Sequence, residues 1–339
     1  MLFDSHCHLT DERLIEDADE VVARAHEGGV TRMVTIGAEP EGWDDVVALA
    51  ARLAGVWAAI GVHPHVADLT DDAVLERAEE LAAREEVVAI GETGLDYYYE
   101  NAPRDAQRRS FLRHIELAGR LGLPVIVHSR SADADTAAVL RDVGRSVRGV
   151  LHCFDGGRDL LDAGLDAGWY ISFSGLVTFK NYEGAELVRA VPADRLLIET
   201  DSPYLAPVPK RGRRNEPALV RHVAEGVARL RGESFEEIAA VTASNASCFY
   251  DLSPVATGCF SPRGSLSFRL AVRAPEAPGQ RAERSTCHVV SRYFRTTWPI
   301  RSPRGRSSSA PPRWSRSLSR MRWTLPRPAW MWPSRTVAR

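Results

Sequence analysis

Short apolar runs alternate with longer segments of helical period over the first 252 residues. The longer segments carry apolar side chains on one face, as Phe111, Ile115 and Ala118 do between residues 106 and 121. This alternation is typical of successive βα units on a parallel sheet. The runs predict eight strands: LFDSHCH from Leu2, RMVTIGA from Arg32, VWAAIGV from Val56, VVAIGET from Val87, PVIVHS from Pro124, GVLHCF from Gly149, YISFSG from Tyr170 and LLIETD from Leu196.

Two further helices are predicted after the eighth strand, roughly from Glu216 to Leu230 and from Ser234 to Phe249. Ser234 suits the N-cap of the second helix, and Glu237 three residues later completes a capping box. Eight βα units in about 250 residues is the size of a closed barrel. The sequence therefore predicts an α/β fold, a single (β/α)₈ TIM barrel over residues 1–252 with two extra C-terminal helices.

The pattern ends at residue 252, and Arg, Ser, Pro and Trp dominate the remainder. We expect residues 253–339 to form a disordered basic tail without a fold of its own. One interpretation is an arm that binds nucleic acid, with Trp298, Trp314 and other tryptophans stacking on bases. The favoured interpretation is translation in a wrong reading frame, because disordered tails usually lack tryptophan. Sequencing the DNA around codon 252 would decide between them.

Charge separates the same two regions. The first 252 residues carry 26 Lys and Arg against 43 Asp and Glu, a net charge of −17, whereas the rest carries 17 Arg and two acidic residues. A barrel of that charge would repel nucleic acid over most of its surface. The five cysteines form no CxxC pair, which indicates a reduced compartment. With no leader-like or membrane-spanning stretch, we expect a cytoplasmic protein without membrane association or an obligate protein partner.

Histidines gather at the C-terminal ends of the predicted strands, the end at which (β/α)₈ barrels carry their active sites. His6 and His8 are two residues apart on the first strand, so both side chains point to the same face. His128 ends the fifth strand and His152 the sixth. Together these imidazoles could converge on a metal ion.

Two carboxylates share this end: Glu92 ends the fourth strand and Asp201 the eighth. A carboxylate shielded from water is costly unless it is paired or coordinated. A salt bridge to Arg130 or Lys210 is the alternative, which the four histidines disfavour. The set suffices for one ion with supporting residues or for two ions sharing a carboxylate. We favour two divalent ions (Mg²⁺, Mn²⁺ or Zn²⁺) bridged by Glu92, with His6, His8 and Asp201 on one side and His128 and His152 on the other.

Other residues near this end are expected to contact the substrate. His63 and His65 close the third strand, and Lys210, Arg211 and Asn215 belong to a basic loop after the eighth strand that could hold phosphates. The alternative for that loop is a solvated charged surface. Some of the aromatic residues on these loops could stack on bases, and others belong to the core. These aromatic residues are Tyr97, Tyr98, Tyr99, Phe154 and Tyr204.

Six short motifs in order resemble one known family, the TatD-type metal-dependent deoxyribonucleases of the amidohydrolase superfamily. The motifs are SHCHL at Ser5, GVHPH at Gly61, GETGLDYY at Gly91, VIVHSR at Val125, LHCFDG at Leu151 and ETDSPYLAP at Glu199. The resemblance covers about residues 1–252. It implies removal of nucleotides from the 3′ end of single-stranded DNA and the same six metal ligands. Related barrels often bridge their metals with a carbamylated lysine, and here Glu92 holds that place.

Glu92, Asp201 and His128 are the expected catalytic residues. Bound ions lower the pKa of water towards about 7 and act as Lewis acids on phosphoryl oxygens. Asp201 would take the proton from that water, and His128 or His63 would protonate the leaving oxygen. Because a metal site alone does not name the bond that is cleaved, two alternatives stay open. One is an amidohydrolase or esterase for a small amide, an ester or aminoacyl-tRNA, and the other is a metal-binding scaffold without turnover.

Overall fold

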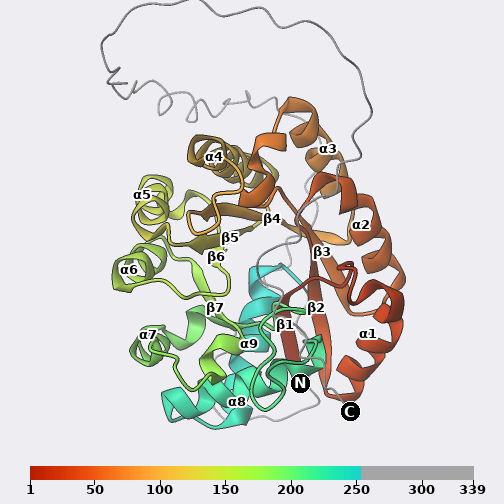
Figure 1. Ribbon diagram of the computed structural model, residues 1–339, viewed down its shortest axis with the longest axis vertical. Coiled ribbons are helices and arrows are strands. Elements are labelled where there is room, and N and C mark those ends of the chain that lie inside the picture. Colours follow the sequence, from red (N-terminus) through yellow and green to blue (C-terminus); the bar gives the residue numbers. More distant parts are fainter. Residues whose placement is uncertain (253–339) are drawn as a thin grey trace, which may run out of the picture. The chain divides into compact units, whose positions relative to one another are not determined.

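The computed structural model of this chain describes residues 1–252, so the predicted tail and its suggested nucleic-acid arm lie outside the described residues. The eight predicted strands form one parallel sheet in sequential order, ringed by helices (Figure 1). This confirms the predicted barrel. The strands are β1 (Leu2–Cys7), β2 (Val30–Gly37), β3 (Val56–Ile60), β4 (Val87–Asp96), β5 (Val125–Arg130), β6 (Gly149–Leu151), β7 (Tyr170–Phe173) and β8 (Leu196–Ile198).

The seam between β1 and β8 closes the ring with few backbone contacts. The His8 amide donates to the Ser202 carbonyl at 2.7 Å, and the Asp201 amide donates to the His6 carbonyl at 2.9 Å. Backbone bonding thus joins the residues whose side chains were expected to bind metal. The seam sets the distance between the histidines of β1 and the carboxylate that follows β8.

A buried carboxyl group ties the same seam one layer lower. Asp4 of β1 is fully buried and accepts hydrogen bonds from the amide and hydroxyl groups of Thr200, at 2.8 and 2.5 Å. Burial raises the pKa of Asp4 to about 8, against the opposing effect of these bonds. Asp4 is therefore mostly protonated at neutral pH and joins β1 to β8 at little electrostatic cost.

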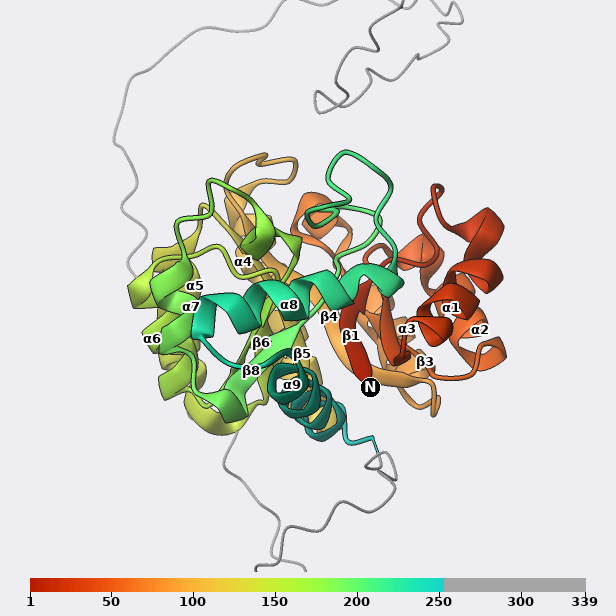
Figure 2. The same ribbon diagram turned by 90° about the horizontal axis from the view of Figure 1, so that it is seen from below.

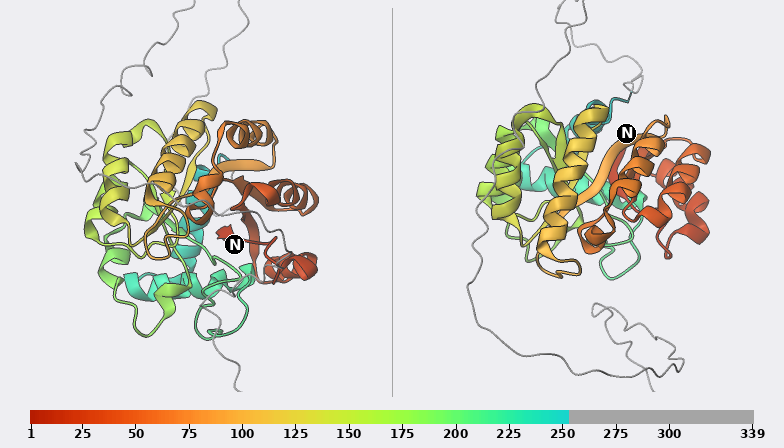
Figure 3. Two further views of the ribbon diagram at one scale, coloured as in Figure 1. Left: turned by 45° about the horizontal axis from the view of Figure 1, so that its top comes forward. Right: turned by 90° about the horizontal axis from the view of Figure 1, so that it is seen from above.

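Helices follow each strand and surround the ring, as two further views show (Figure 3). Of the two extra helices predicted after the eighth strand, α8 completes the eighth βα unit and α9 alone is additional among the described residues. The predicted capping box is present at α9, where the Ser234 hydroxyl accepts from the Glu237 amide at 3.2 Å. Within residues 1–252, none of the helices has the length and apolarity needed to cross a membrane. The helices are α1 (Ala18–Glu27), α2 (Trp43–Arg52), α3 (Asp72–Ala82), α4 (Arg104–Leu121), α5 (Asp133–Val143), α6 (Arg158–Asp166), α7 (Ala185–Ala190), α8 (Val220–Arg231) and α9 (Phe235–Phe249).

α9 lies across the N-terminal end of the barrel, opposite the segment that joins β8 to α8 (Figure 2). The hydroxyl of Tyr250 donates to the Ser5 carbonyl at 2.7 Å, and its ring stacks on Phe3 with the centroids 5.9 Å apart. Phe249 is fully buried beside them. The helix therefore closes this end with apolar side chains, and polar side chains of the interior can reach solvent only at the C-terminal end.

Candidate functional site

Glu92 of β4 is a buried carboxylate whose two oxygens face different groups of histidines. Its Oε1 lies 2.8 Å from Nε2 of His152, 3.0 Å from Nδ1 of His128 and 3.4 Å from Nε2 of His63. These three rings come from the ends of β3, β5 and β6. Side chains far apart in sequence thus meet at one oxygen atom.

The other oxygen of Glu92 faces the seam. Nε2 of His6 lies 3.4 Å from Glu92 Oε2, and Nε2 of His8 lies 3.4 Å from Oδ1 of Asp201. The two histidine Nε2 atoms are 3.2 Å apart. This second group comes from β1 and the segment after β8. It is joined to the first group by Glu92 and by the contact between His6 and His152.

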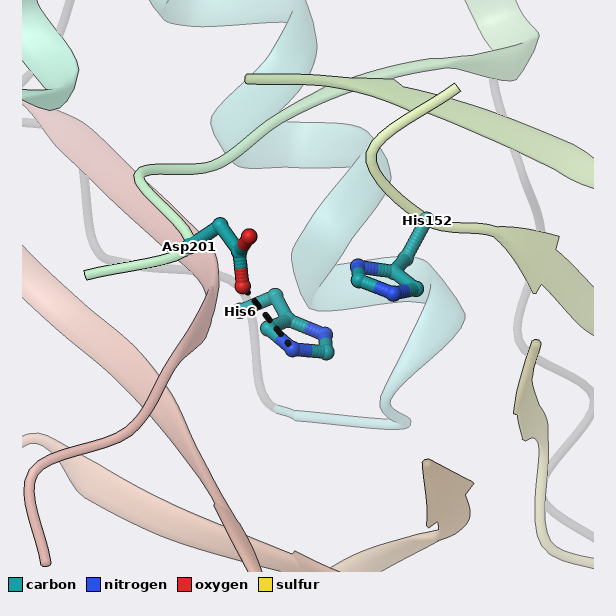
Figure 4. Close-up of side chains that lie close together, drawn as sticks. All are labelled: His6, His152 and Asp201. Atoms are coloured by element: carbon teal, nitrogen blue, oxygen red, sulfur yellow. Dashed lines mark ion pairs between the residues drawn. The ribbon is translucent and has the colours of Figure 1, made fainter. Parts of the chain in front are cut away.

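His6 and His152 connect the two sides of the site. Their rings stack almost parallel, with the centroids 4.0 Å apart and an interplanar angle of 6°. Figure 4 shows these rings with Asp201 beside His6; the Nε2 to Oδ1 distance of this ion pair is 3.7 Å. The donor atoms therefore form one continuous cluster, with Glu92 between its two sides.

A further carboxylate, Asp96, supports the histidines from behind. Its Oδ2 lies 2.9 Å from Nε2 of His65 and 3.4 Å from Nε2 of His128, while its Oδ1 accepts the amides of Tyr98 and Tyr99 at 2.9 Å. Asp96 was not among the site residues predicted from the sequence. The signal was available, because Asp96 is four residues after Glu92 on one strand and even spacing returns to the same face.

Glu199 supports His152 in a similar way. Its Oε1 lies 3.2 Å from Nδ1 of His152 and accepts the Cys153 amide at 2.7 Å. Glu199 is fully buried two residues before Asp201, and the period of two predicts that both share a strand face. Histidine ligands are commonly held by an outer carboxylate in this manner.

The charges of the site depend on one another. Burial favours a neutral Glu92, but the charges of His152 and His63 and several hydrogen bonds hold its pKa well below the ordinary value. Burial lowers the pKa of His152, and Glu92 and Glu199 together raise it well above normal. Within residues 1–252, no Lys or Arg forms an ion pair with Glu92 or Asp201, so the alternative of salt bridges to Arg130 or Lys210 is wrong. Only imidazoles balance these carboxylates, a donor set that suits divalent cations.

The structure brings all six expected ligands together and adds His63. This side chain was expected to contact substrate, yet its Nε2 shares Oε1 of Glu92 with two other histidines. Imidazole nitrogens and carboxylate oxygens at this spacing fit divalent metal ions such as Zn²⁺ or Mn²⁺. Three sets of ligand atoms each lie within 4.8 Å of one another: those of His6, His152 and Asp201, of His6, His8 and Glu92, and of His63, Glu92 and His128.

The residues expected to contact substrate differ in their distance from the metal-binding cluster and in their exposure. His65 pairs with Asp96 beside the site. Lys210 and Arg211 are exposed on the segment between β8 and α8, and the Arg211 guanidinium lies 4.2 Å from the centre of the Phe179 ring. In the described part of the chain, neither cation has a carboxylate within ion-pair distance. Both remain available to an anionic ligand.

Asn215 does not contact solvent, and its expected role in substrate binding is wrong. It is fully buried, and its Nδ2 donates to the carbonyls of Thr200 and Tyr204 at 2.8 and 2.5 Å. Its Oδ1 accepts the Glu216 amide at 3.0 Å. Since all of these groups are used internally, Asn215 anchors the basic segment to the barrel.

A pocket of about 390 Å³ opens next to His8, between the segments that follow β1 and β2. Four carboxylates line it, those of Asp11, Glu39, Glu41 and Asp45. A negatively charged ligand would be repelled on this side of the barrel mouth. Lys210 and Arg211, which have no carboxylate partner within residues 1–252, lie on the segment after β8 instead.

This chain is similar to known proteins in both sequence and structure. The profile of the family described as TatD related DNase matches residues 3–251. The uncharacterized metal-dependent hydrolase YcfH of Escherichia coli K12 is 47% identical over 249 residues, covering 72% of this chain and 93% of YcfH. The 3′-5′ ssDNA/RNA exonuclease TatD of Shigella flexneri is 37% identical over 259 residues, covering 74% of this chain and 100% of the relative. The solved structure of the TatD homologue YJJV from E. coli has a TM-score of 0.69 and 28% identity, covering 74% of this chain and 98% of YJJV.

Proposed function

Since the chain belongs to the TatD-related DNase family of metal-dependent hydrolases, we propose that it cleaves phosphodiester bonds at the 3′ end of single-stranded DNA. A relative that is 37% identical carries the name of a 3′-5′ ssDNA/RNA exonuclease, which supports nucleic acid as the substrate. The observation that carries the proposal is the position of Glu92, whose two oxygens face two groups of metal-binding side chains.

We assign two divalent ions to this cluster, with Glu92 between them. When bound, they would lower the pKa of water and act as Lewis acids on the phosphoryl oxygens. His6, His8, Asp201 and Glu92 would hold one ion, and His63, His128, His152 and Glu92 would hold the other.

Asp201 is the carboxylate best placed to accept a proton from water. Its side chain is 15% exposed, against 4% for Glu92, so water reaches Asp201 more readily. Burial raises its pKa, but the hydrogen bond and charge of His8 and the charge of His6 lower it overall. Asp201 therefore stays ionised and able to act as a general base at neutral pH.

His128 is better placed to bind metal than to donate a proton. Its Nδ1 faces Glu92 Oε1 and its Nε2 faces Asp96 Oδ2, so neither ring nitrogen points to a substrate. We therefore propose that Asp96 orients His128 for metal binding, and we do not retain His128 as the acid that protonates the leaving oxygen.

Nucleic acid must bind locally, because residues 1–252 have a net charge of −17 and repel a polyanion as a whole. Lys210 and Arg211 are exposed and lack carboxylate partners in the described part of the chain. We propose that these cations, together with the bound ions, attract the phosphates to the barrel mouth.

A metal-reconstitution assay tests this function. Metal-free protein would be loaded separately with Mg²⁺, Mn²⁺ or Zn²⁺ and offered single-stranded DNA, double-stranded DNA, RNA and a panel of small esters and amides. We expect stepwise shortening of single strands from the 3′ end, and activity lower by at least about 10²–10³-fold from Glu92→Gln prepared in the same way. Turnover of an ester or amide without cleavage of any nucleic acid would overturn the proposal and favour an amidohydrolase or esterase.

A further inference from the structure

Two large aromatic side chains are exposed beside the site. Tyr98 and Tyr99 follow β4 and are 61% and 40% exposed. Their rings meet edge to face with the centroids 4.8 Å apart. Neighbouring exposed aromatic rings leave apolar surface in water, which is unusual enough to indicate a binding surface.

Arg130 completes this surface. Its guanidinium carbon lies 4.3 Å from the ring centre of Tyr98 and 4.9 Å from that of Tyr99. It reaches them because Asp96 of β4 pairs with Arg130 of β5 in the sheet register. The charge of Arg130 acts on Asp155, whose pKa burial raises, but no described carboxylate lies within ion-pair distance of it. We call Tyr98, Tyr99 and Arg130 the Tyr–Arg platform.

One carboxylate connects the Tyr–Arg platform to the metal-binding cluster. Asp96 Oδ1 accepts the amides of Tyr98 and Tyr99, and Asp96 Oδ2 faces His65 and His128. Asp96 is itself almost fully buried, and its pKa is lowered by the hydrogen bonds of His128 and His65 against the effect of burial. The platform is therefore fixed relative to His128.

The aromatic rings also form a continuous path to the cluster. The ring of Tyr99 lies 5.4 Å from that of His65, which lies 4.3 Å from that of His63. Nε2 of His63 is 3.4 Å from Glu92 Oε1. A ligand that reaches Glu92 could thus contact the Tyr–Arg platform with a neighbouring group.

Charge favours this side of the mouth for an anionic strand. The pocket beside His8 is lined by carboxylates and would repel phosphates. The Tyr–Arg platform instead offers an unpaired guanidinium and two ring surfaces. Single-stranded nucleic acids bind to such a combination, with bases stacking on aromatic rings and a cation on the backbone.

We propose that the Tyr–Arg platform is a nucleobase-binding subsite for the strand whose end occupies the metal-binding cluster. A base stacks against Tyr98 or Tyr99, and Arg130 binds the adjoining phosphate. This inference rests on the proposed function, because it takes the substrate to be a single-stranded nucleic acid. Stacking does not distinguish deoxyribose from ribose, so DNA and RNA would both use the subsite.

The test removes one base at a time. Oligodeoxynucleotides with a single abasic residue, stepped inward from the 3′ end, would be compared with the intact strand by kcat/KM. For the wild-type protein, we expect a loss of about 5- to 150-fold at one abasic position, the range of one base stacked on an aromatic ring. Tyr98→Ala/Tyr99→Ala should cleave intact and abasic strands equally slowly, mainly through a higher KM.

Conservative variants separate stacking from folding. Tyr98→Phe/Tyr99→Phe keeps both rings and should retain the difference between intact and abasic strands. Arg130→Gln should raise KM for both strands and reduce the slope of log KM against log salt by about one phosphate contact. Arg195→Ala is a matched control, because Arg195 also stacks on a tyrosine, Tyr170, with 5.3 Å to the ring centre, and precedes β8 at the other end of the barrel.

A small substrate distinguishes failure of the subsite from failure of the function. Bis(p-nitrophenyl) phosphate lacks a base and a strand, so its turnover should be equal in the wild type and in all platform variants. If the alanine variant keeps the abasic difference, the subsite is overturned while nuclease activity stands. If metal-loaded wild type cleaves no nucleic acid, both the proposed function and the subsite are wrong.

Discussion

The two ends of the barrel are built from the same strands and have opposite chemistry. At the N-terminal end Phe3 of β1 packs with Tyr250, and α9 excludes water. Three residues further along β1, His6 faces Glu92. The buried carboxylates around His6 favour the binding of ions, whereas the apolar side chains at the N-terminal end are stabilised by packing alone. Stability and chemistry are therefore separated along each strand, and substitutions at the two ends should have different consequences.

The largest effect on activity is expected from a substitution of Glu92, at the C-terminal end of the barrel. Glu92→Gln keeps the shape of the side chain and removes its charge, so we expect kcat to fall by at least about 10²–10³-fold. The melting temperature without metal should fall by only a few degrees, because the histidines that face Glu92 can become neutral when its charge is removed. Steady-state kinetics with saturating metal and a thermal melt measure both quantities. Near-full activity would remove Glu92 from the site.

The opposite end should lose stability instead. Phe249→Ala removes a fully buried ring from the closed end, and we expect the free energy of unfolding to fall by about 3–5 kcal/mol. Denaturant unfolding measures the loss, and kcat below the transition should be retained. Tyr250→Phe is the control: it loses only the hydrogen bond to Ser5, worth about 0.5–1.5 kcal/mol. An equal loss in both variants would contradict the role of ring packing.

A buried histidine on one of the surrounding helices supports the C-terminal end of the barrel, and its pKa predicts how the free energy of unfolding depends on pH. His114 of α4 is buried; its Nε2 accepts the Val62 amide at 3.1 Å, which fixes the segment carrying His63. Burial lowers the pKa of His114 to about 4. The unfolded chain, with a histidine pKa near 6.5, therefore binds the proton first as pH falls.

The stability contributed by neutral His114 should be complete above about pH 6.5 and lost as pH falls towards 4, by about 3 kcal/mol in all. Free energies of unfolding from urea titrations at pH 7 and 4.5 would be compared for wild type and His114→Gln. Because other titrating groups are common to both proteins, the wild type should lose more stability than the variant. An identical pH dependence would show that His114 does not titrate in this way.

Asp96 tests whether the active end depends on its supporting carboxylates. Asp96→Asn keeps an oxygen for the amides of Tyr98 and Tyr99 but weakens the hold on His128. We expect metal affinity or kcat to fall by about 10- to 100-fold, as for other carboxylates behind histidine ligands. Metal titration followed by kinetics separates the two effects. Unchanged values of both would make Asp96 a purely structural residue.

The smallest effect is expected from deleting residues 253–339. We propose that residues 1–252 contain the whole enzyme, because the family match ends at residue 251 and every side chain of the metal-binding cluster lies before Pro203. Deleting residues 253–339 should leave kcat/KM and melting temperature within about twofold and a few degrees of the full chain. Loss of DNA cleavage on truncation would instead support an arm that binds nucleic acid.

Sequence patterns predicted the elements well because they depend on local periodicity. The apolar runs placed all eight strands, and Ser234 with Glu237 placed the start of α9. The period of two predicted that His6 and His8 share a face, and their Nε2 atoms lie 3.2 Å apart. The position of polar residues at strand ends identified most of the cluster around Glu92. Asp96 was overlooked although the same period applied to it.

By itself the sequence determined which side chains point into the barrel and at which end, since strand direction and side-chain alternation are properties of the local chain. The tertiary structure alone decided which atoms meet. The two oxygens of Glu92 face different histidines, the two ring nitrogens of His128 face different carboxylates, and Asn215 is buried. These results depend on strand register and on the closure of β1 against β8, which set distances between residues about 200 positions apart and leave no trace in local periodicity.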